Sequence, residues 1–486
     1  MFQWARNLIG GSRPTKSERP QARASGTYDN ARTTDENKRS WWGVDYMSAR
    51  AANSFAVRRV LRGRSRHEVA NNPYLFGIAN SNADDLIDTG PTLQILTSKD
   101  EYNRQVERAW REWCDEVDLT EKLRTVKLAK TIDGEGFLVL KTVEDLEHPV
   151  KLYPCDIEAD QVTNPSPQKL EDWFIDGITL HPTTGQPVIY HVLKHHPGDF
   201  FFPDFNPLSA ERVTARWVIH WFHKYRPGQV RGVPVFTPSL DLFNDLRSFR
   251  RAVLNNAHLV AAHTVLLEQD MNGIPAGSDD DANKTYQPFV SVPIDRGMQA
   301  VLPPGMKAQW PDAKQPATTY EMFQEKCLGE ACRPLNYPLN LALGTSQKFN
   351  FSSAKLDHIN YRNGLRVERE DCNKTCLRIL FRAWYLEAII TGVVPPFDGI
   401  RLPPHQFQWP GFEPLDAVAD ATADHQRLAA GTDTWRDFWA RRGRDYRDVL
   451  RQQAAEQAEI EELGVKFGEP VTRTEQAVPA EAANVA

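Results

Sequence analysis

The side chains that come closest to a catalytic set are three carboxylates. Asp133 and Glu135 flank Gly134 in a turn before a predicted strand, and Asp156 lies in a later strand segment. Carboxylate oxygens are ligands that Mg²⁺ prefers, so these groups would form an acidic site if the fold brought them together. The sequence therefore leaves open a metal-dependent DNA-processing enzyme, or a regulatory subunit of one, as an alternative function.

Other ligand-type residues predict no metal site. His220 and His223 would point to opposite faces of a strand, because side chains alternate along a strand. Cys372 and Cys376 would share a helix face, but neither this pair nor Cys327 with Cys332 has the spacing of a structural zinc module. Asp279–Asp281 lack the glycine and the final glutamate of a calcium loop and indicate a solvated turn. We therefore expect no cofactor.

The motifs of nucleotide and hydrolase chemistry are missing from the sequence. There is no GxxxxGK phosphate loop, no GxSxG elbow, no HExxH pair and no GxGxxG fingerprint. Trp110 and Trp113 lie outside any basic groove pattern, which favours a role as core or interface anchors over base stacking. These observations predict a protein that is not an enzyme.

Composition and charge restrict the function classes further. The chain has 486 residues, of which 41% are hydrophobic and 25% are charged, which predicts several globular domains. No apolar run reaches the roughly 18 residues that cross a bilayer, and the amino-terminal segment lacks a secretory pattern, so we expect a cytosolic protein and no membrane. Residues 1–70 carry a net charge of +8 and the rest −14. Tight binding of DNA normally needs a basic body, so a firm DNA clamp is not expected.

The chain then divides into helical and β-rich regions. Helical spacing of apolar residues predicts helices at 100–118 and 121–131, and short β-branched runs such as GFLVLKTV predict a β-rich region at 136–225. A long helix is predicted from Thr237, as N-cap, to a point before Gly273. Another helix should occupy 318–333.

A second long helix is predicted from Ser352 or Ser353 to Gly392. Its candidate buried residues are Leu356, Ile359, Val367, Leu377, Leu380 and Trp384. Residues 414–463 should form one or two helices joined near Gly431 and Gly443. Residues 10–40 and 468–486 have the composition of flexible segments.

Several segments, in order, resemble the lambda family of phage portal proteins, also called head-to-tail connectors. These segments are NNPYLFGIANSNADDLIDTG (71–90), DGEGFLVL (133–140), VKLYPCDIEAD (150–160), GQPVIYHVLKHHPGD (185–199), VIHWFHKYRPGQVRGVPVFTPSL (218–240) and FNFSSAKL (349–356). The resemblance that they carry extends over about residues 40 to 460. The most specific is RPGQVRGVPVFTP, a turn that leads into a helix.

The resemblance implies an α+β, multi-domain portal fold whose copies form a ring of about twelve subunits around a channel. The parts it implies are a flexible basic arm (1–40), a wing (41–236), a first stem helix (237–268), a clip (269–316), a second stem helix (317–335), a tunnel loop with a long wing helix (336–400), a crown (401–465) and a disordered tail (466–486).

The resemblance also implies a function and partners. Such a ring stands at the capsid vertex of the virion, is assembled in the cytoplasm of a bacterial host, and lets double-stranded DNA pass during packaging and ejection. The implied partners are further copies of the chain, the terminase large subunit, the major capsid protein and a head-tail connector or adaptor protein. Within the tunnel loop, Gln347, Lys348 and Asn350 are the residues expected to approach DNA. A head or tail protein without a channel is a third possibility.

Overall fold

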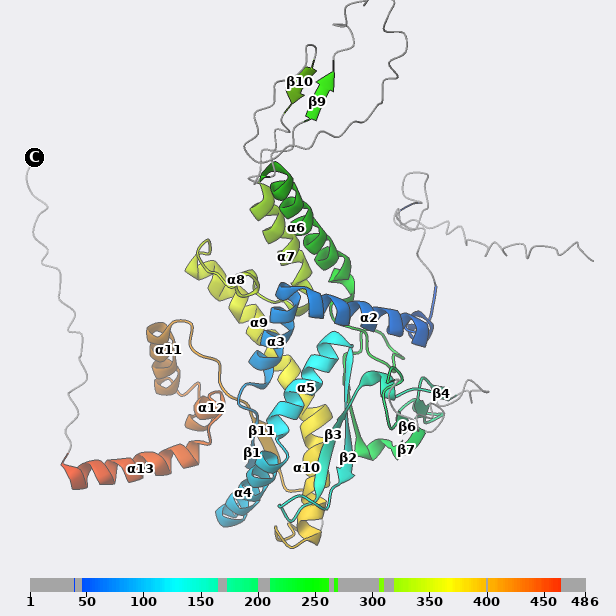
Figure 1. Ribbon diagram of the computed structural model, residues 1–486. Coiled ribbons are helices and arrows are strands. Elements are labelled where there is room, and N and C mark those ends of the chain that lie inside the picture. The colour runs from blue at the N-terminus through cyan, green and yellow to red at the C-terminus, as the bar shows by residue number, and fades with distance from the viewer. Residues whose placement is uncertain are drawn as a thin grey trace, which may run out of the picture. The chain divides into compact units, whose positions relative to one another are not determined.

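The computed structural model describes residues 39, 46–164, 173–199, 210–261, 266–269, 306–309, 319–398 and 401–464. Helices and antiparallel sheets are both present, which confirms the α+β class (Figure 1). The chain forms two compact units, 1–52 and 53–486. The described part of the first holds the short helix α1 (Ala49–Ala52), and every element below belongs to the second. Asp279–Asp281, the tail from residue 466 and nearly all of the arm lie outside the described residues.

Four helices begin the second unit, and the last two match the sequence prediction closely. They are α2 (Phe55–Asn71), α3 (Pro73–Ile87), α4 (Asp100–Glu116) and α5 (Leu119–Ile132). Asn72 caps α3 by accepting a hydrogen bond of 3.1 Å from the Tyr74 N–H, and Pro73 occupies the first helical position. Both features are typical of a helix start. The cap satisfies a backbone N–H that has no partner within the helix, and proline has no N–H at a position where it would be unsatisfied.

Two antiparallel sheets occupy the predicted β-rich region. The first has the order β3-β2-β8, and the second β4-β5-β6-β7. The strands are β2 (Glu135–Thr142), β3 (Leu152–Ile157), β4 (Phe174–Ile175), β5 (Ile178–Leu180), β6 (Pro187–Leu193), β7 (Ala210–Thr214) and β8 (Val218–Phe222).

Strand β2 is buried on both faces, which explains its continuous apolar run. Leu138 and Leu140 contribute to the main core, whereas Phe137 and Val139 join a second core with residues of the other sheet. Successive side chains of a strand point to opposite faces, so only a strand covered on both sides reads as uninterrupted hydrophobic sequence. Strand β2 is therefore the shared wall of the two cores.

Aromatic rings fill the centre of the main core. Trp110 and Trp113 are buried, and the ring of Trp110 meets that of Trp384 edge to face at 5.2 Å. The structure thus places both tryptophans of α4 in the core, as the sequence indicated. The helix that carries Trp384, α10 (Arg378–Ile390), packs along the side of this cluster.

Helix α6 (Leu240–Ala261) lies side by side with α7 (Thr319–Ala331) (Figure 1). The ring of Phe249 on α6 packs against Phe323 of α7 at 4.6 Å. Two predictions about the first helix are wrong. Thr237 does not cap α6: residues Thr237–Ser239 form a 3₁₀ turn, and the Thr237 hydroxyl donates to the Pro234 carbonyl at 2.7 Å.

The first helix is also shorter than predicted. Its described residues end at Ala261, and Leu266–Gln269 form strand β9, which pairs antiparallel with β10 (Met306–Gln309). The apolar run at its end supports a strand because backbone partners are available from β10. Most of the predicted clip, 269–316, lies outside the described residues.

The second long helix is continuous from Phe351 to Ile390, with one π turn. It consists of α9 (Phe351–Cys372), η8 (Asn373–Leu377) and α10, and it ends before Gly392, whose φ is +76°. Leu377, Leu380 and Trp384 are buried as predicted, but Leu356, Ile359 and Val367 are exposed by 65%, 40% and 73%. The prediction of burial was wrong for these three because apolar spacing identifies a face but not what covers it.

The last described region contains three helices where the sequence predicted one or two. Strand β11 (His405–Gln408) first pairs with β1 (Thr92–Ile95), and α11 (Ala417–Ala429), α12 (Trp435–Ala440) and α13 (Tyr446–Leu463) follow. The breaks fall at Gly431 and Gly443, as predicted. Both glycines have positive φ, a backbone conformation that residues other than glycine rarely adopt.

Among the described residues, no helix is long and apolar enough to span a membrane.

Candidate functional site

The loop that holds Gln347, Lys348 and Asn350 connects α8 (Leu339–Leu343) to α9, and all three residues are exposed. Lys348 bridges two carboxylates of α7: its Nζ lies 3.1 Å from Glu325 and also contacts Glu321. The hydrogen bonds that Lys348 donates to Glu321 and, next in effect, to Glu325 raise the pKa of Lys348, so the lysine is charged at neutral pH. This cation therefore ties the loop to α7.

The other two predicted residues differ in what holds them. The Asn350 side chain accepts a hydrogen bond of 3.2 Å from the Ser352 N–H and so caps α9, which gives it a structural task. At Gln347 the backbone N–H donates to the Thr345 hydroxyl at 3.4 Å, while the side chain is exposed. Asn350 thus has a capping role and Lys348 an ion-pairing role, whereas Gln347 bonds within the loop through its backbone.

Glu135 is the centre of a buried ion network that reaches from α2 to the turn before α6. Its side chain is fully buried, and Arg231 Nη2 donates to it at 2.6 Å. Arg62 donates to the same oxygen, His220 Nε2 lies 2.9 Å from the other, and the Gly232 N–H donates at 2.8 Å. A buried carboxylate is stable only with such partners, because water no longer solvates it.

The electrostatics of this network are set by burial and by charge pairing. Burial alone would raise the pKa of Glu135, but Arg231 and Arg62 outweigh it and hold that pKa well below its usual range. Burial lowers the pKa of His220 despite the nearby carboxylate, so the ring is neutral at pH 7. Its Nε2–H then donates to Glu135, and Nδ1 accepts from the Tyr190 hydroxyl at 3.3 Å.

The turn RPGQVRGVPVFTP passes directly beside the start of β2, where glycine is required on both sides. A Cβ on Gly232 would lie 2.0 Å from the Gly134 carbonyl oxygen, and a Cβ on Gly134, whose φ is +89°, would lie 2.2 Å from the backbone of Val233. Backbone contact this close fixes the path of the chain from the sheets into α6. This explains why the turn was the most distinctive segment of the sequence.

The three carboxylates singled out in the sequence do not form an open acidic site. Asp133 receives two hydrogen bonds, of 2.7 and 2.8 Å, from Arg66, and Glu135 is surrounded as described. Asp156 is separate and lies 3.3 Å from Lys122 on α5. Each carboxylate is thus neutralised by its own basic partners, which leaves little affinity for Mg²⁺ at these positions.

A second ion cluster, which no sequence pattern indicated, joins α5 to α9. Lys127 and Lys130 lie 2.6 and 2.9 Å from Glu368. Burial would raise the pKa of Glu368, but the two ammonium groups lower it to about 2. Lys130 also lies over the ring of Trp221 at 4.2 Å. The long helix is therefore bound to the body by charges as well as by its core residues.

The other residues whose side chains could bind a metal lie at several separate places in the fold. His223 lies beyond β8 and packs edge to face on Tyr225, apart from His220 in the network. Cys372 and Cys376 are both buried, and burial raises the pKa of Cys376 well above its ordinary value. Among the described residues, one group has metal-ligand proximity, formed by Glu158, Asp160 and His196. Asp160 is already paired with Arg62 at 2.8 Å and Arg66 at 2.9 Å.

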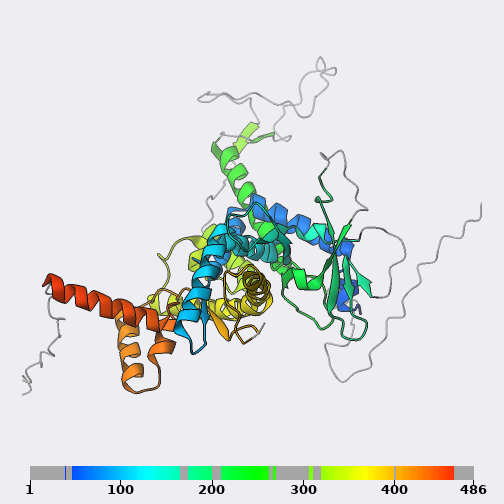
Figure 2. The same cartoon turned by 90° about the horizontal axis from the view of Figure 1, so that it is seen from below.

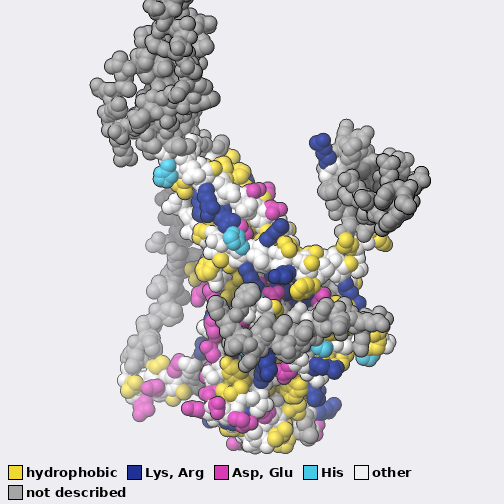
Figure 3. Space-filling view, turned by 45° about the vertical axis from the view of Figure 1, so that its right-hand side comes forward, with side chains coloured by type: hydrophobic (Ala, Val, Ile, Leu, Met, Phe, Trp, Pro, Cys, Tyr) yellow, Lys and Arg dark blue, Asp and Glu magenta, His cyan; other side chains and the backbone are white. Residues whose placement is uncertain are grey.

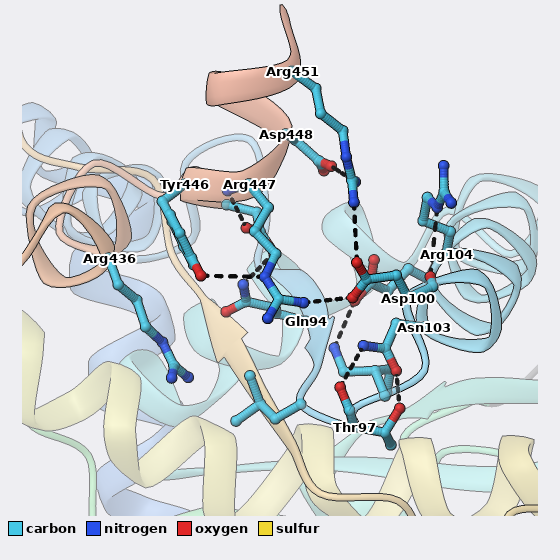
Figure 4. Close-up of a pocket in the computed structure, with 14 residues that line it drawn as sticks. Gln94, Thr97, Asp100, Asn103, Arg104, Arg436, Tyr446, Arg447, Asp448 and Arg451 are labelled. Carbon is cyan, nitrogen blue, oxygen red and sulfur yellow. Dashed lines mark hydrogen bonds and ion pairs between the residues drawn. The ribbon is translucent and has the colours of Figure 1, made fainter.

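A small polar pocket of about 110 Å³ lies where α13 meets α4 and β1. Figure 4 shows Arg447 and Arg451 of α13 pointing toward Asp100 at the start of α4, at distances of 2.5 and 3.3 Å. Deeper in the joint, the Ile95 N–H donates to Glu107 at 2.6 Å. Burial, with the nearby Asp445 and Asp448, raises the pKa of Glu107 to about 7. The pocket is a charged joint and holds no arrangement of nucleophile and base.

The fold thus combines helices with small antiparallel sheets, and buried ion networks join them. A family model described as "Phage portal protein, lambda family" matches residues 34–369. Because this match spans more than half of the chain, the protein belongs to the lambda family of phage portal proteins.

Individual relatives were also found. The chain is similar to a "Probable portal protein" of Halomonas phage phiHAP-1, with 22% identity over 478 residues that cover 93% of this chain and 90% of that one. Among solved structures it is similar to the neck of a native gene transfer agent particle computed with C12 symmetry, with a TM-score of 0.41 and 14% identity, covering 76% of this chain and 89% of that chain. It is also similar to an HK97 family phage portal protein from Corynebacterium diphtheriae, with a TM-score of 0.31 and 13% identity, covering 58% and 80%.

Proposed function

We propose that copies of this chain assemble into a ring at one vertex of a phage capsid and that double-stranded DNA passes through its channel during packaging and ejection. The observation that carries the proposal is membership of the portal family over residues 34–369. The number of copies expected is about twelve, in a closed ring with head-to-tail contacts. Terminase, the major capsid protein and a head-tail adaptor are the partners that this role requires, and the ring would be built in the host cytoplasm before it becomes part of the virion.

Within the ring, we assign the parts of the portal fold to described elements. The wing consists of the two sheets, α2 to α5 and the long helix from Phe351; the stem consists of α6 and α7; the tunnel loop is 344–350; and the crown consists of α11 to α13. The clip would be the stretch that contains β9 and β10. The ion network of Glu135 supports this division, because it fixes the turn at which the sheets lead into the stem.

Some basic side chains of the proposed stem helices α6 and α7 make no ion pair within the described part of the chain. Figure 3 shows lysine and arginine side chains, in dark blue, on the column formed by α6 and α7. Arg247 pairs with Glu68 at 2.7 Å, whereas Arg250 and Arg251 have no ion pair within the described part of the chain. A few such charges would give weak contacts with phosphates regardless of sequence, as a conduit for moving DNA requires.

The role of Lys348 can be tested with a matched pair of variants. If Lys348 contacts DNA, virions with Lys348→Ala will contain less packaged DNA and give a lower titre. The double variant Glu321→Gln/Glu325→Gln breaks the same ion pairs but keeps the cation, so it should package normally. Equal losses in both would show that the tether to α7 matters and would contradict the DNA contact, as would a normal DNA content with Lys348→Ala. Ring assembly of each variant is measured first.

The enzymatic alternative is tested on the purified protein. Because Asp133, Glu135 and Asp156 are each paired with basic side chains, we expect no cleavage of DNA in the presence of Mg²⁺ or Mn²⁺. Cleavage that is lost in Glu135→Gln, with the fold intact by circular dichroism, would support the enzyme instead.

A further inference from the structure

The end of α13 and a groove beside α9 have complementary properties, although neither is covered in the single chain. Figure 2 shows α13 running outward, and every described residue from Leu450 onward is exposed except Ile460, which is half-buried. The last turns carry four glutamates, Glu456, Glu459, Glu461 and Glu462, none with an ion pair among the described residues. Magenta and yellow side chains cover this end in Figure 3.

One face of α13 continues from its anchored start to its free end. Val449 is buried against the body, and at helical spacing it shares a face with Glu456, Ile460 and Leu463. Leu463 is 68% exposed. Glu459, Glu461 and Glu462 lie in or next to the last turn of the helix, where the dipole makes carboxylates unfavourable. A sequence that breaks a local rule in this way commonly does so for a contact elsewhere.

The groove has a volume of about 1150 Å³ and lies between α9 with η8 on one side and residues 406–412, with Ala440 and Arg441, on the other. Its lining contains five basic and two acidic side chains, so it attracts anions. Its wall is aromatic where the Arg369 guanidinium lies over the rings of Phe412 and Trp409, at 4.6 and 5.4 Å. A helix with both glutamates and apolar residues on one face matches such a lining.

Two further features show that the groove is unfilled in one copy. Ile359 and Val367, which the sequence suggested would be buried, are exposed at its edge. Arg366, between them on the same helix, is exposed and has no hydrogen bond or ion pair within the described part of the chain. An apolar edge beside an unpaired cation is typical of an interface whose partner is missing.

We propose that, in the assembled ring, the free end of α13 from one copy docks into this groove of a neighbouring copy. The inference rests on the proposed function, since a head-to-tail ring repeats one projection and one recess in every copy. Glu456 and Glu459 would meet Arg366 and Lys374, and Ile460 and Leu463 would cover Ile359 and Val367. The helix end and the groove thus complete each other around the ring.

Charge reversal tests the pairing. Glu456→Lys, or Arg366→Glu, should raise the concentration at which half of the copies are in rings by about fivefold, measured by mass photometry. The combined variant should return to within about twofold of the original. Glu461→Lys is the matched control, because it makes the same charge change on the opposite face. Lysine at the end of a helix is favourable to the dipole, so none of these helix changes should unfold α13.

Proximity is tested directly in rings assembled from ordinary and ¹⁵N-labelled copies. A carbodiimide, which couples carboxylates to lysine amines, should join a peptide with Glu456 or Glu459 of one isotope to a peptide with Lys374 of the other. The inference is overturned if Glu456→Lys behaves like Glu461→Lys, if the combined variant is not rescued, or if these glutamates couple to another surface or another protein. Failure of the unaltered chain to form rings would instead contradict the proposed function.

Discussion

The residues packed around Glu135, which form the body, and the helices α11 to α13, which we assign to the crown, both contain many ion pairs, but the two sets differ in burial. Around Glu135 the arginines Arg62 and Arg231 are buried with the carboxylate, whereas a crown pair such as Arg451 with Asp448, at 3.3 Å, faces solvent. Exposed pairs contribute little because water solvates the separated charges nearly as well. Buried pairs cannot be separated without leaving a charge in a medium that does not solvate it. We infer that the body keeps one arrangement while the crown can rearrange at little cost.

Among the substitutions that test this contrast, Glu135→Ala should have the largest effect on stability. The change leaves Arg62 and Arg231 buried without their carboxylate, and we expect a loss of about 3 to 5 kcal/mol in the free energy of unfolding. Denaturant titration of the full chain, followed by tryptophan fluorescence, measures it. A loss no larger than that of a crown variant would show that burial does not distinguish the two regions.

A smaller effect is expected from acid at the junction of α5 and α9. The pKa of Glu368 is lowered from 4.5 to about 2, so its pairing with Lys127 and Lys130 stabilises the fold above pH 4.5. This contribution is lost as the pH falls through about 2. In Glu368→Gln the melting temperature should be lower at neutral pH, and the gap to the unaltered protein should close on acidification. A constant gap would contradict the assigned pairing.

The contact between α13 and the pocket that it forms with α4 and β1 should respond to pH in the opposite direction. The pKa of Glu107 is raised from 4.5 to about 7, so the folded state favours the protonated carboxyl. Its contribution is complete below pH 4.5 and is lost as the pH rises through about 7. Hydrogen exchange in residues 446–451 should therefore be faster at pH 8 than at pH 5, after correction for the intrinsic rate. Glu107→Gln should abolish the difference.

The smallest change is expected within the crown itself. Asp448 pairs with Arg451 at the surface of α13, at 3.3 Å. Removing an exposed pair costs at most about 1 kcal/mol, so Asp448→Ala should leave the unfolding transition nearly unchanged. A loss comparable to that of Glu135→Ala would mean that the crown is as firmly fixed as the body.

The sequence predicted elements whose signals are local. The apolar run of β2, the glycine breaks at Gly431 and Gly443, and the end of the long helix at Gly392 follow from period, burial and backbone freedom at each position. The 3₁₀ turn at Thr237 was missed because an N-cap residue and a turn residue have the same side-chain chemistry.

Long-range charge pairing could not be predicted in the same way. Arg58, Arg62 and Arg66 are four apart, which on a helix is equally typical of a solvated face. Their burial depends on Glu135 and on Arg231, which follows Glu135 by 96 residues, and only the folded chain brings them together. Likewise, Ile359 and Val367 have the spacing of a core face, but no pattern distinguishes a face that covers its own chain from one that meets another copy.

The central claim, that many copies surround an open channel, is tested most directly by electron cryomicroscopy of the purified, assembled chain viewed along its axis. The account predicts a closed ring with a central hole wide enough for duplex DNA, with α6 and the loop 344–350 facing that hole. A protein that stays monomeric under all assembly conditions, or particles with density across the centre, would contradict it.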